Sequence, residues 1–285
     1  MRKRLLIITF FRWLFKHLSI LPAASMLLLC NIAFADNIQG ESLRSGSGFF
    51  ITQEYLVTNE HVANSQCAQI IVRINDNDTV PARLIAIDAK HDLALLRSPK
   101  FSSRQTMLRR NMDAIKVGDK VVAAGYPVNV IATGTYELAS AQLLNISDSE
   151  GDTDKLQFSH STEQGYSGGP LLDRSGNLVG VTKGEVKKYE KANGKEEAKT
   201  LVSDADEAVS SAILKAFLAS NGIPYLEANS TATLTDKELE ALAQNFTVGV
   251  QCTTGTGNLS PILSVFPTQD TLPVEPGLPV TAPPK

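Results

Sequence analysis

Short runs of apolar and β-branched residues, separated by polar turns, recur from Glu41 to about Tyr225. Their length and their spacing are typical of strands, and a series of many short strands is typical of a β-sandwich or a β-barrel. The expected strands are Gly48–Ile51, Tyr55–Thr58, Gln69–Ile74, Arg83–Ile87, Leu93–Leu96, Lys120–Gly125, Leu138–Ile146, Gln157–Ser159, Pro170–Leu172 and Leu178–Thr182. The pattern therefore predicts an all-β fold for this region.

The pattern changes after the last of these strands. The charged stretch Lys183–Lys199 is predicted to be a solvated hairpin or loop, and a loop that gates access to a site is the alternative. Asp204–Asn221 is predicted to be a helix that stops before Gly222 and Pro224. The apolar face of this helix consists of Val209, Ile213, Ala216, Phe217 and Ser220.

A second helix and a last strand are expected nearer the C-terminus. Thr235–Phe246 is predicted to be helical, because Thr235 and Glu238 have the spacing of a capping box. Thr247–Cys252 is predicted to be a strand. Residues 226–252 are thus expected to form a C-terminal helix and strand that dock on the preceding domain.

The first 35 residues have the composition of a targeting segment. Five basic and no acidic residues precede Asp36, and the apolar run Leu18–Ala35 ends in two alanines separated by Phe34. This pattern predicts a bacterial-type secretory signal peptide, residues 1–35, cleaved after Ala35. An uncleaved anchor helix is the alternative, although the run is short for a membrane span and contains Pro22. Export would place the protein in the periplasm or outside the cell.

Removal of this segment makes the chain more acidic. Loss of the five basic residues changes the formal net charge from −3 to −8. Such a charge argues against nucleic acid as a partner and against stable association with an anionic membrane after cleavage. Nothing in the sequence indicates an oligomeric state.

The last segment, residues 253–285, contains seven of the 13 prolines of the chain, interspersed with threonine and glycine. This composition predicts a disordered tail with polyproline character. A cell-wall spacer and a ligand for a partner protein are the alternatives.

The stretch Gly165-Tyr166-Ser167-Gly168-Gly169-Pro170 is the strongest candidate for chemistry. Glycines on both sides of a serine allow a sharp turn that exposes backbone amides. The N–H groups of Gly165 and Ser167 can then converge beside the Ser167 hydroxyl, as an oxyanion hole requires. A glycine-rich β-turn without chemistry is the alternative, because such turns are common.

The positions of the four histidines (His17, His61, His91 and His160) restrict the type of site. An α/β-hydrolase needs its histidine after the serine, and none follows Ser167. The subtilisin order needs an aspartate before the histidine, and only Asp36 lies between the targeting segment and His61. The order histidine, aspartate, serine remains, with His61, Asp92 and Ser167 as the candidates.

Four segments around these residues resemble one known family. They are Ser45-Gly-Ser-Gly-Phe-Phe-Ile51, Val57-Thr-Asn-Glu-His61-Val62, Asp88-Ala-Lys-His-Asp92-Leu-Ala-Leu-Leu96 and Gly165-Tyr-Ser167-Gly-Gly-Pro-Leu171. Their sequences and order resemble a chymotrypsin-fold, trypsin-like serine protease of the bacterial HtrA/Deg-like branch. Four co-linear motifs are a specific signal, where any single one is weak.

The resemblance implies two six-stranded antiparallel β-barrels within residues 36–225, joined near residues 127–135. His61 and Asp92 would come from the first barrel and Ser167 from the second, with the site in the cleft between them. Only 60 residues follow Tyr225, too few for the PDZ domain that HtrA-like proteases usually append, so regulation through such a domain is not expected.

The resemblance also implies roles for several residues. The triad His61, Asp92 and Ser167 would hydrolyse peptide bonds of protein or peptide substrates, without a cofactor or metal. A specificity pocket would be lined by His160, Ser161, Thr162, Thr182, Lys183 and Gly184. A small hydroxylated pocket suits short side chains, His160 could instead favour acidic ones, and a purely structural His160 is the plainer alternative.

Tyr166 departs from the family, which carries an acidic residue or an asparagine there. The ion pair that activates trypsin-like zymogens is therefore not expected, so the loop is either preformed or ordered by a ligand. A protease-fold binding protein with a silent cleft and an esterase remain the alternatives to an endopeptidase.

Two cysteines lie outside the targeting segment, Cys67 and Cys252. Chymotrypsin-like enzymes often brace the region after the catalytic histidine with a disulfide, and export would place the protein where disulfides persist. We therefore predict that Cys67 pairs with Cys252, with two buried free thiols as the alternative.

Overall fold

The computed structural model describes residues 42–75, 78–99, 105–127, 135–146, 154–159, 161–191 and 199–254. The expected signal peptide, most of the expected inter-barrel junction, His160 and nearly all of the expected tail lie outside the described residues.

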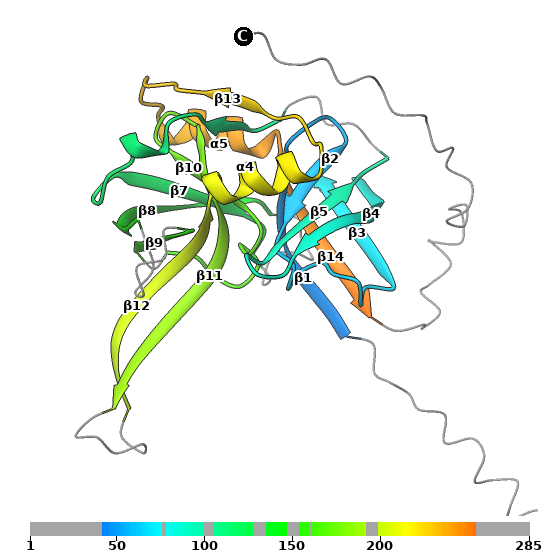
Figure 1. Ribbon diagram of the computed structural model, residues 1–285, viewed down its shortest axis with the longest axis horizontal. Helices are drawn as coiled ribbons and strands as arrows, with labels where there is room; N and C mark the ends of the chain where they lie inside the picture. Colours follow the sequence, from blue (N-terminus) through cyan, green and yellow to red (C-terminus); the bar gives the residue numbers. More distant parts are fainter. Residues whose placement is uncertain are drawn as a thin grey trace, which may run out of the picture. The chain divides into compact units, whose positions relative to one another are not determined.

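The first barrel is closed by a strand from the far end of the chain. Its strands run in the order β1-β14-β3-β4-β5-β2, and every neighbouring pair is antiparallel. The strands are β1 (Ser42–Phe50), β2 (Tyr55–Thr58), β3 (Gln69–Asn75), β4 (Asp78–Asp88), β5 (Leu93–Arg97) and β14 (Thr247–Thr254). Figure 1 shows β14, in orange, beside the blue β1.

The second barrel is formed by the middle of the chain. Its order is β10-β7-β8-β9-β12-β11, and pairing of β10 with β11 closes the ring. The strands are β7 (Lys120–Gly125), β8 (Glu137–Asn145), β9 (Lys155–Ser159), β10 (Pro170–Asp173), β11 (Leu178–Lys191) and β12 (Lys199–Ser210). The all-β fold with two six-stranded antiparallel barrels is thus confirmed.

Short elements extend the second barrel. β6 (Met107–Arg109) pairs in parallel with β11, and β13 (Leu226–Ala228) pairs in parallel with β6. A 3-10 turn, η1 (Met112–Ala114), follows β6, and its N-cap is the side chain of Asn111. These elements were not predicted, because three residues are too few to show a periodic pattern.

β11 and β12 form a long hairpin that continues beyond the barrel (Figure 1). Residues 180–191 pair with residues 199–210, whereas β9 pairs with β12 only at residues 205–209. The charged stretch that follows Thr182 therefore belongs in large part to a hairpin, one of the two structures expected for it.

The prediction for Asp204–Asn221 is wrong in its first part. β12 continues to Ser210, and the helix α4 (Ser211–Ser220) begins only there. Residues 205–209 pair with strands on both sides, so the sheet satisfies their backbone groups better than a helix isolated from it would. Ser210 ends the strand and caps α4 by accepting a hydrogen bond from the Ala212 N–H.

The second helix agrees with its prediction. α5 (Asp236–Gln244) begins after Thr235, and both hydrogen bonds of the capping box between Thr235 and Glu238 are present. α5 leads directly into β14, whose side chains at Val248, Val250 and Cys252 are buried in the first barrel. The C-terminal strand is therefore part of the barrel wall and does not simply lie on its surface.

Cys67 and Cys252 form a disulfide bond, the pairing expected from the sequence, with their Cα atoms 5.4 Å apart. Cys67 lies in the turn after His61, and Cys252 lies on β14 next to β1 and β3. The bond thus joins the last strand of the barrel to the segment that carries the candidate histidine. In the part of the chain that the structure describes, no helix is both long and apolar enough to cross a membrane.

Candidate active site

His61 and Asp92 meet where two neighbouring strands of the first barrel end and begin. β2 and β5 are paired, His61 follows β2 by three residues, and Asp92 immediately precedes β5. The Asp92 carbonyl accepts hydrogen bonds from the Asn59 side chain at 2.9 Å and from the Glu60 N–H at 3.2 Å. These bonds join the two turns without involving the side chain of His61 or of Asp92.

The Asp92 carboxylate holds His61 at two points. One oxygen, Oδ2, lies 2.8 Å from His61 Nδ1, and the other, Oδ1, accepts a hydrogen bond from the His61 N–H at 3.0 Å. The Asp92 side chain is 11% exposed and the His61 side chain 47% exposed. With Nδ1 bound to a carboxylate, Nε2 is the nitrogen that can accept a proton.

Asp92 adopts a backbone conformation that few residues tolerate. Its φ is +58°, in the left-handed region, where aspartate and asparagine occur more readily than other non-glycine residues. This turn directs its carboxylate back to the His61 backbone. Backbone strain of this kind is concentrated at functional sites.

Glycine conformations shape the loop that carries Ser167. Gly165 has φ +110° and Gly168 has φ +86°, both in the range that favours glycine. The Gly168 N–H donates to the Thr182 carbonyl at 2.8 Å, and the Thr182 N–H donates to the Gly169 carbonyl at 2.9 Å. The loop is therefore fastened to β11 immediately after the serine.

The structure brings this loop against the segment that carries His61. A Cβ atom placed on Gly168 would lie 2.3 Å from Thr58 Oγ1 and 2.9 Å from the Asn59 N. A Cβ atom placed on Gly46 would lie 2.6 Å from Val62 Cγ2 and 2.8 Å from the Ser167 carbonyl oxygen. Absence of a side chain at these two glycines thus allows the Ser167 backbone to approach both sides of the His61 turn.

The hydroxyl of Ser167 donates to the Lys183 carbonyl at 3.1 Å. A β-bulge between Thr182 and Gly184 turns the backbone at Lys183, and Gly184 has φ +119°. Among the residues that the structure describes, no hydrogen bond joins Ser167 to His61. The hydroxyl therefore has a backbone partner in this arrangement.

The N–H groups of Gly165 and Ser167 have no acceptor within the described part of the chain. Buried backbone N–H groups are nearly always paired, so an N–H group without a partner at a buried residue such as Gly165 is unusual. Gly165 is buried and Ser167 is half-buried. These two donors are the ones that the sequence predicts for an oxyanion hole.

Tyr166, between these donors, points into the core of the second barrel and is 3% exposed. Burial, with Glu137 and Glu163 nearby, raises the pKa of its hydroxyl well above the usual range, so the ring stays neutral. An apolar anchor thus occupies the position where the related family has an acid or an asparagine.

The described residues that are expected to form the specificity pocket lie in two segments of the chain, one after β9 and one on β11. Thr182 is buried, Lys183 and Gly184 are half-buried, and all three belong to β11. Ser161 and Thr162 are held by Asp206, a fully buried residue of β12 that the sequence analysis did not single out. One Asp206 oxygen accepts hydrogen bonds from the N–H groups of both residues, at 3.0 and 2.9 Å, and from the Thr162 hydroxyl at 2.8 Å.

His91 contacts groups away from His61. Its Nδ1 lies 2.5 Å from Asp88 Oδ2, and its Nε2 lies 3.4 Å from Asp154 Oδ2 in the second barrel. The pKa of Asp88 is lowered, because the hydrogen bonds and charge of His91 outweigh partial burial of the carboxyl group. His91 thus contributes to contact between the barrels, and no described group of three histidine, cysteine or acidic side chains could hold a metal ion.

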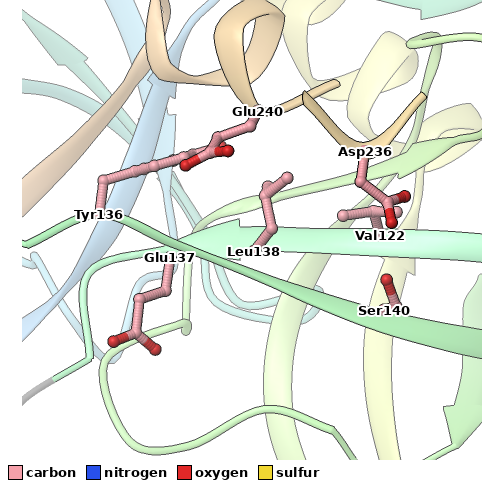
Figure 2. Close-up of a pocket in the computed structure, with 7 residues that line it drawn as sticks. All are labelled: Val122, Tyr136, Glu137, Leu138, Ser140, Asp236 and Glu240. Carbon is pink, nitrogen blue, oxygen red and sulfur yellow. The ribbon is translucent and has the colours of Figure 1, made fainter. Parts of the chain in front are cut away.

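A pocket of about 390 Å³ lies elsewhere, between β7, β8 and the start of α5 (Figure 2). Its lining consists of Val122, Tyr136, Glu137, Leu138, Ser140, Asp236 and Glu240. None of the candidate site residues contributes to this pocket, so it is separate from the His61–Asp92 pair.

Comparisons with known proteins agree with this arrangement. Residues 46–181 match the family described as "Trypsin-like peptidase domain". An uncharacterized protein, y4bJ, of Sinorhizobium fredii is 31% identical over 215 residues, which are 75% of this chain and 33% of that protein.

Two further relatives carry functional names. A probable periplasmic serine endoprotease, DegP-like, of Rhizobium meliloti is 36% identical over 137 residues, 48% of this chain and 27% of that protein. The periplasmic pH-dependent serine endoprotease DegQ of Escherichia coli is 34% identical over 141 residues, 50% of this chain and 31% of that protein. The chain spans about a third or less of the length of these relatives.

The matched segment covers β2 to β5 and part of β1 in the first barrel, the His61–Asp92 pair and the Ser167 loop. Together with the two-barrel fold and the DegP- and DegQ-like relatives, this match shows that the chain belongs to the chymotrypsin-fold, trypsin-like peptidases of the HtrA branch.

Proposed function

We propose that this protein is an exported serine endopeptidase that cleaves peptide bonds with His61, Asp92 and Ser167. The observation that carries the proposal is the pair of hydrogen bonds that the Asp92 carboxylate accepts from His61, at 2.8 and 3.0 Å. Beside this pair lies the serine loop, whose Gly165 and Ser167 N–H groups have no acceptor among the described residues. A carboxylate–imidazole pair of this geometry is what activates a serine hydroxyl in this class of enzyme.

In the acylation step, His61 Nε2 removes the Ser167 proton while Oγ attacks the substrate carbonyl. The Asp92 carboxylate stabilises the imidazolium that forms and keeps Nε2 directed outward. The imidazolium then donates its proton to the leaving amine as the peptide C–N bond breaks. The acyl group remains bound to Ser167 Oγ as an acyl-enzyme. Water, deprotonated by His61, hydrolyses the acyl-enzyme in the second half of the reaction.

Charge that develops on the substrate oxygen would be stabilised by the N–H groups of Gly165 and Ser167. These donors have no acceptor among the described residues, so a substrate oxygen would not need to displace a protein group. Donors that are already oriented reduce the energy of the transition state more than flexible ones do.

Before attack, the Ser167 hydroxyl must leave the Lys183 carbonyl, 3.1 Å away, and turn to His61. This step requires rotation about the Cα–Cβ bond of Ser167, which is fast compared with typical turnover. The substrate class that we propose is protein or peptide, in line with the names of the endoprotease relatives. Those names, together with the N-terminal pattern, also support a periplasmic location.

The proposal is tested with the full chain, Ser167→Ala and His61→Ala. A fluorophosphonate probe should label Ser167 in the wild type only, and cleavage of a denatured protein mixture should fall to background in both variants. The substitutions replace exposed or half-exposed side chains, so the melting temperature should change little. Peptide cleavage that persists in Ser167→Ala would contradict the assignment, and labelling without any peptide cleavage would indicate an esterase.

A further inference from the structure

Ser47 is a fully buried serine on β1 to which no role has been assigned. It lies in the first barrel, opposite Gly249 of β14, yet its hydroxyl forms hydrogen bonds with Gly165 and Tyr126 of the second barrel. Its position in the Ser45-Gly-Ser-Gly motif gives no indication of this, because the contacts cross 79 and 118 residues of sequence.

Two atoms of Ser47 bind two carbonyls of the nucleophile loop, residues 165–169, which carries Ser167. The hydroxyl donates to the Gly165 carbonyl at 2.6 Å, and the Ser47 N–H donates to the Ser167 carbonyl at 2.8 Å. The same hydroxyl accepts a hydrogen bond from the Tyr126 N–H at 2.9 Å, so its own hydrogen is directed to Gly165. The loop is therefore fixed on both sides of Tyr166 by a single residue.

The peptide group between Gly165 and Tyr166 is consequently held at both ends. Its carbonyl is bound by Ser47, and its N–H donates to the Glu163 carbonyl at 3.3 Å. This peptide lies between the two peptides that carry the Gly165 and Ser167 N–H groups. If it rotated, at least one of these N–H groups would change direction.

We propose that Ser47 is a positioning residue that keeps the Gly165 and Ser167 N–H groups oriented for the oxyanion of the substrate. The inference rests on the proposed function. It explains how the loop is preformed although Tyr166, unlike an acidic residue at this position, cannot form an ion pair. Ser47 does not contact the substrate in this role and acts through the Gly165 carbonyl.

Two neighbouring glycines leave the space that the Ser47 side chain occupies. A Cβ atom on Gly125 would lie 2.8 Å from Ser47 Oγ, and one on Gly169 would lie 3.3 Å from Ser47 Cβ. The hydroxyl thus fits a space that two glycines leave open. Because no described side chain with a donor replaces it, its removal would leave the Gly165 carbonyl without a partner.

The experiment compares Ser47→Ala with Thr106→Val in the full chain. Thr106 is also fully buried, and its hydroxyl also donates to a backbone carbonyl, that of Phe50 at 2.9 Å, but outside the nucleophile loop. Both variants should lower the melting temperature, because Ser47→Ala removes two buried hydrogen bonds and Thr106→Val removes one. Only Ser47→Ala should lower kcat for peptide cleavage, by about 10- to 100-fold with KM within about threefold, somewhat less than direct loss of an oxyanion donor.

The rate of fluorophosphonate labelling of Ser167 should fall in parallel, because the phosphoryl oxygen uses the same donors. Ser47→Cys, whose thiol is a weak donor, should give an intermediate kcat, and it replaces Ser47→Ala if that variant does not fold. An active wild type with Ser47→Ala and Ser47→Cys equal to Thr106→Val in kcat would overturn this inference alone. A wild type without labelling or cleavage would overturn the proposed function, and this inference with it.

Discussion

At the residue scale, the backbone at Asp92 matters as much as its carboxylate. The left-handed conformation at φ +58° lets one side chain bind both the ring and the N–H of His61. Asparagine tolerates this conformation about as well as aspartate, whereas alanine does not. The two contributions of Asp92, to chemistry and to the turn, can therefore be separated by the choice of substitution.

We expect Asp92→Asn and Asp92→Ala to lower kcat to a similar, severe extent but to differ in stability. Loss of the carboxylate that sets the His61 tautomer should reduce kcat by roughly 10⁴-fold in both. Asp92→Ala should in addition unfold at a lower urea concentration than Asp92→Asn. Its free energy of unfolding should be lower by about 1 kcal/mol, because alanine in the left-handed region is strained. Equal stability of the two variants would show that the conformation at residue 92 carries no such cost.

At the scale of elements, packing of Tyr166 holds the nucleophile loop. In trypsin-like relatives an ion pair holds the corresponding loop. Tyr166 is buried against the second barrel, and a Cβ atom on Gly125 would lie 3.0 Å from both its Cα and Cδ1 atoms. The hydroxyl of Tyr166 has no hydrogen bond to a described residue, so the ring is the part that anchors the loop.

Tyr166→Phe should therefore keep both activity and melting temperature close to those of the wild type. Tyr166→Ala should create a cavity and cost about 3–5 kcal/mol of unfolding free energy, with a fall in kcat in the fraction that remains folded. Denaturant unfolding and peptide cleavage measure the two effects. A large loss of activity in a stable Tyr166→Phe variant would mean that the hydroxyl, and not the ring, is essential.

At the scale of the whole molecule, the first barrel depends on a strand that lies about 150 residues after its fifth strand. β14 fills the position between β1 and β3, and its buried side chains include Val248, Val250 and Cys252. Burial of each large apolar side chain contributes about 1.5–3 kcal/mol, so loss of the strand approaches the whole stability of a typical domain. The open edges of β1 and β3 would also lose their backbone partners.

A chain that ends at Asn245 should accordingly fail to unfold cooperatively, while a chain that ends at Thr254 should melt like the full chain. β14 runs antiparallel to β1, with Thr254 opposite Ser42. Residues 246–254 joined by a short turn in front of Ser42 should therefore restore the barrel to the chain that ends at Asn245. Circular dichroism during heating compares these three chains with the full chain, and cooperative melting of the chain that ends at Asn245 at the wild-type temperature would refute the structural role of β14.

The sequence by itself determined the strands of both barrels except β12, the capped helix that precedes β14 and the identity of the candidate His61–Asp92 pair. These features are local, since apolar alternation, a capping box and short motifs each depend on residues close in the chain. It also indicated the pairing of Cys67 with Cys252, because no other cysteine lies outside the targeting segment. For Asp204–Ser210 the local pattern gave the wrong result, because pairing with β9 and β11 outweighed helical periodicity.

Only the tertiary structure decided how distant segments meet. The place of β14 between β1 and β3, the hold of Asp206 on Ser161 and Thr162, and the contact of the Ser47 hydroxyl with Gly165 all join residues more than 40 positions apart. A buried serine or aspartate has the same letter in the sequence as an exposed one, and its hydrogen-bond partners are set by packing of the two barrels. The candidate chemistry is therefore encoded in short motifs, whereas its orientation depends on how the barrels close and contact each other.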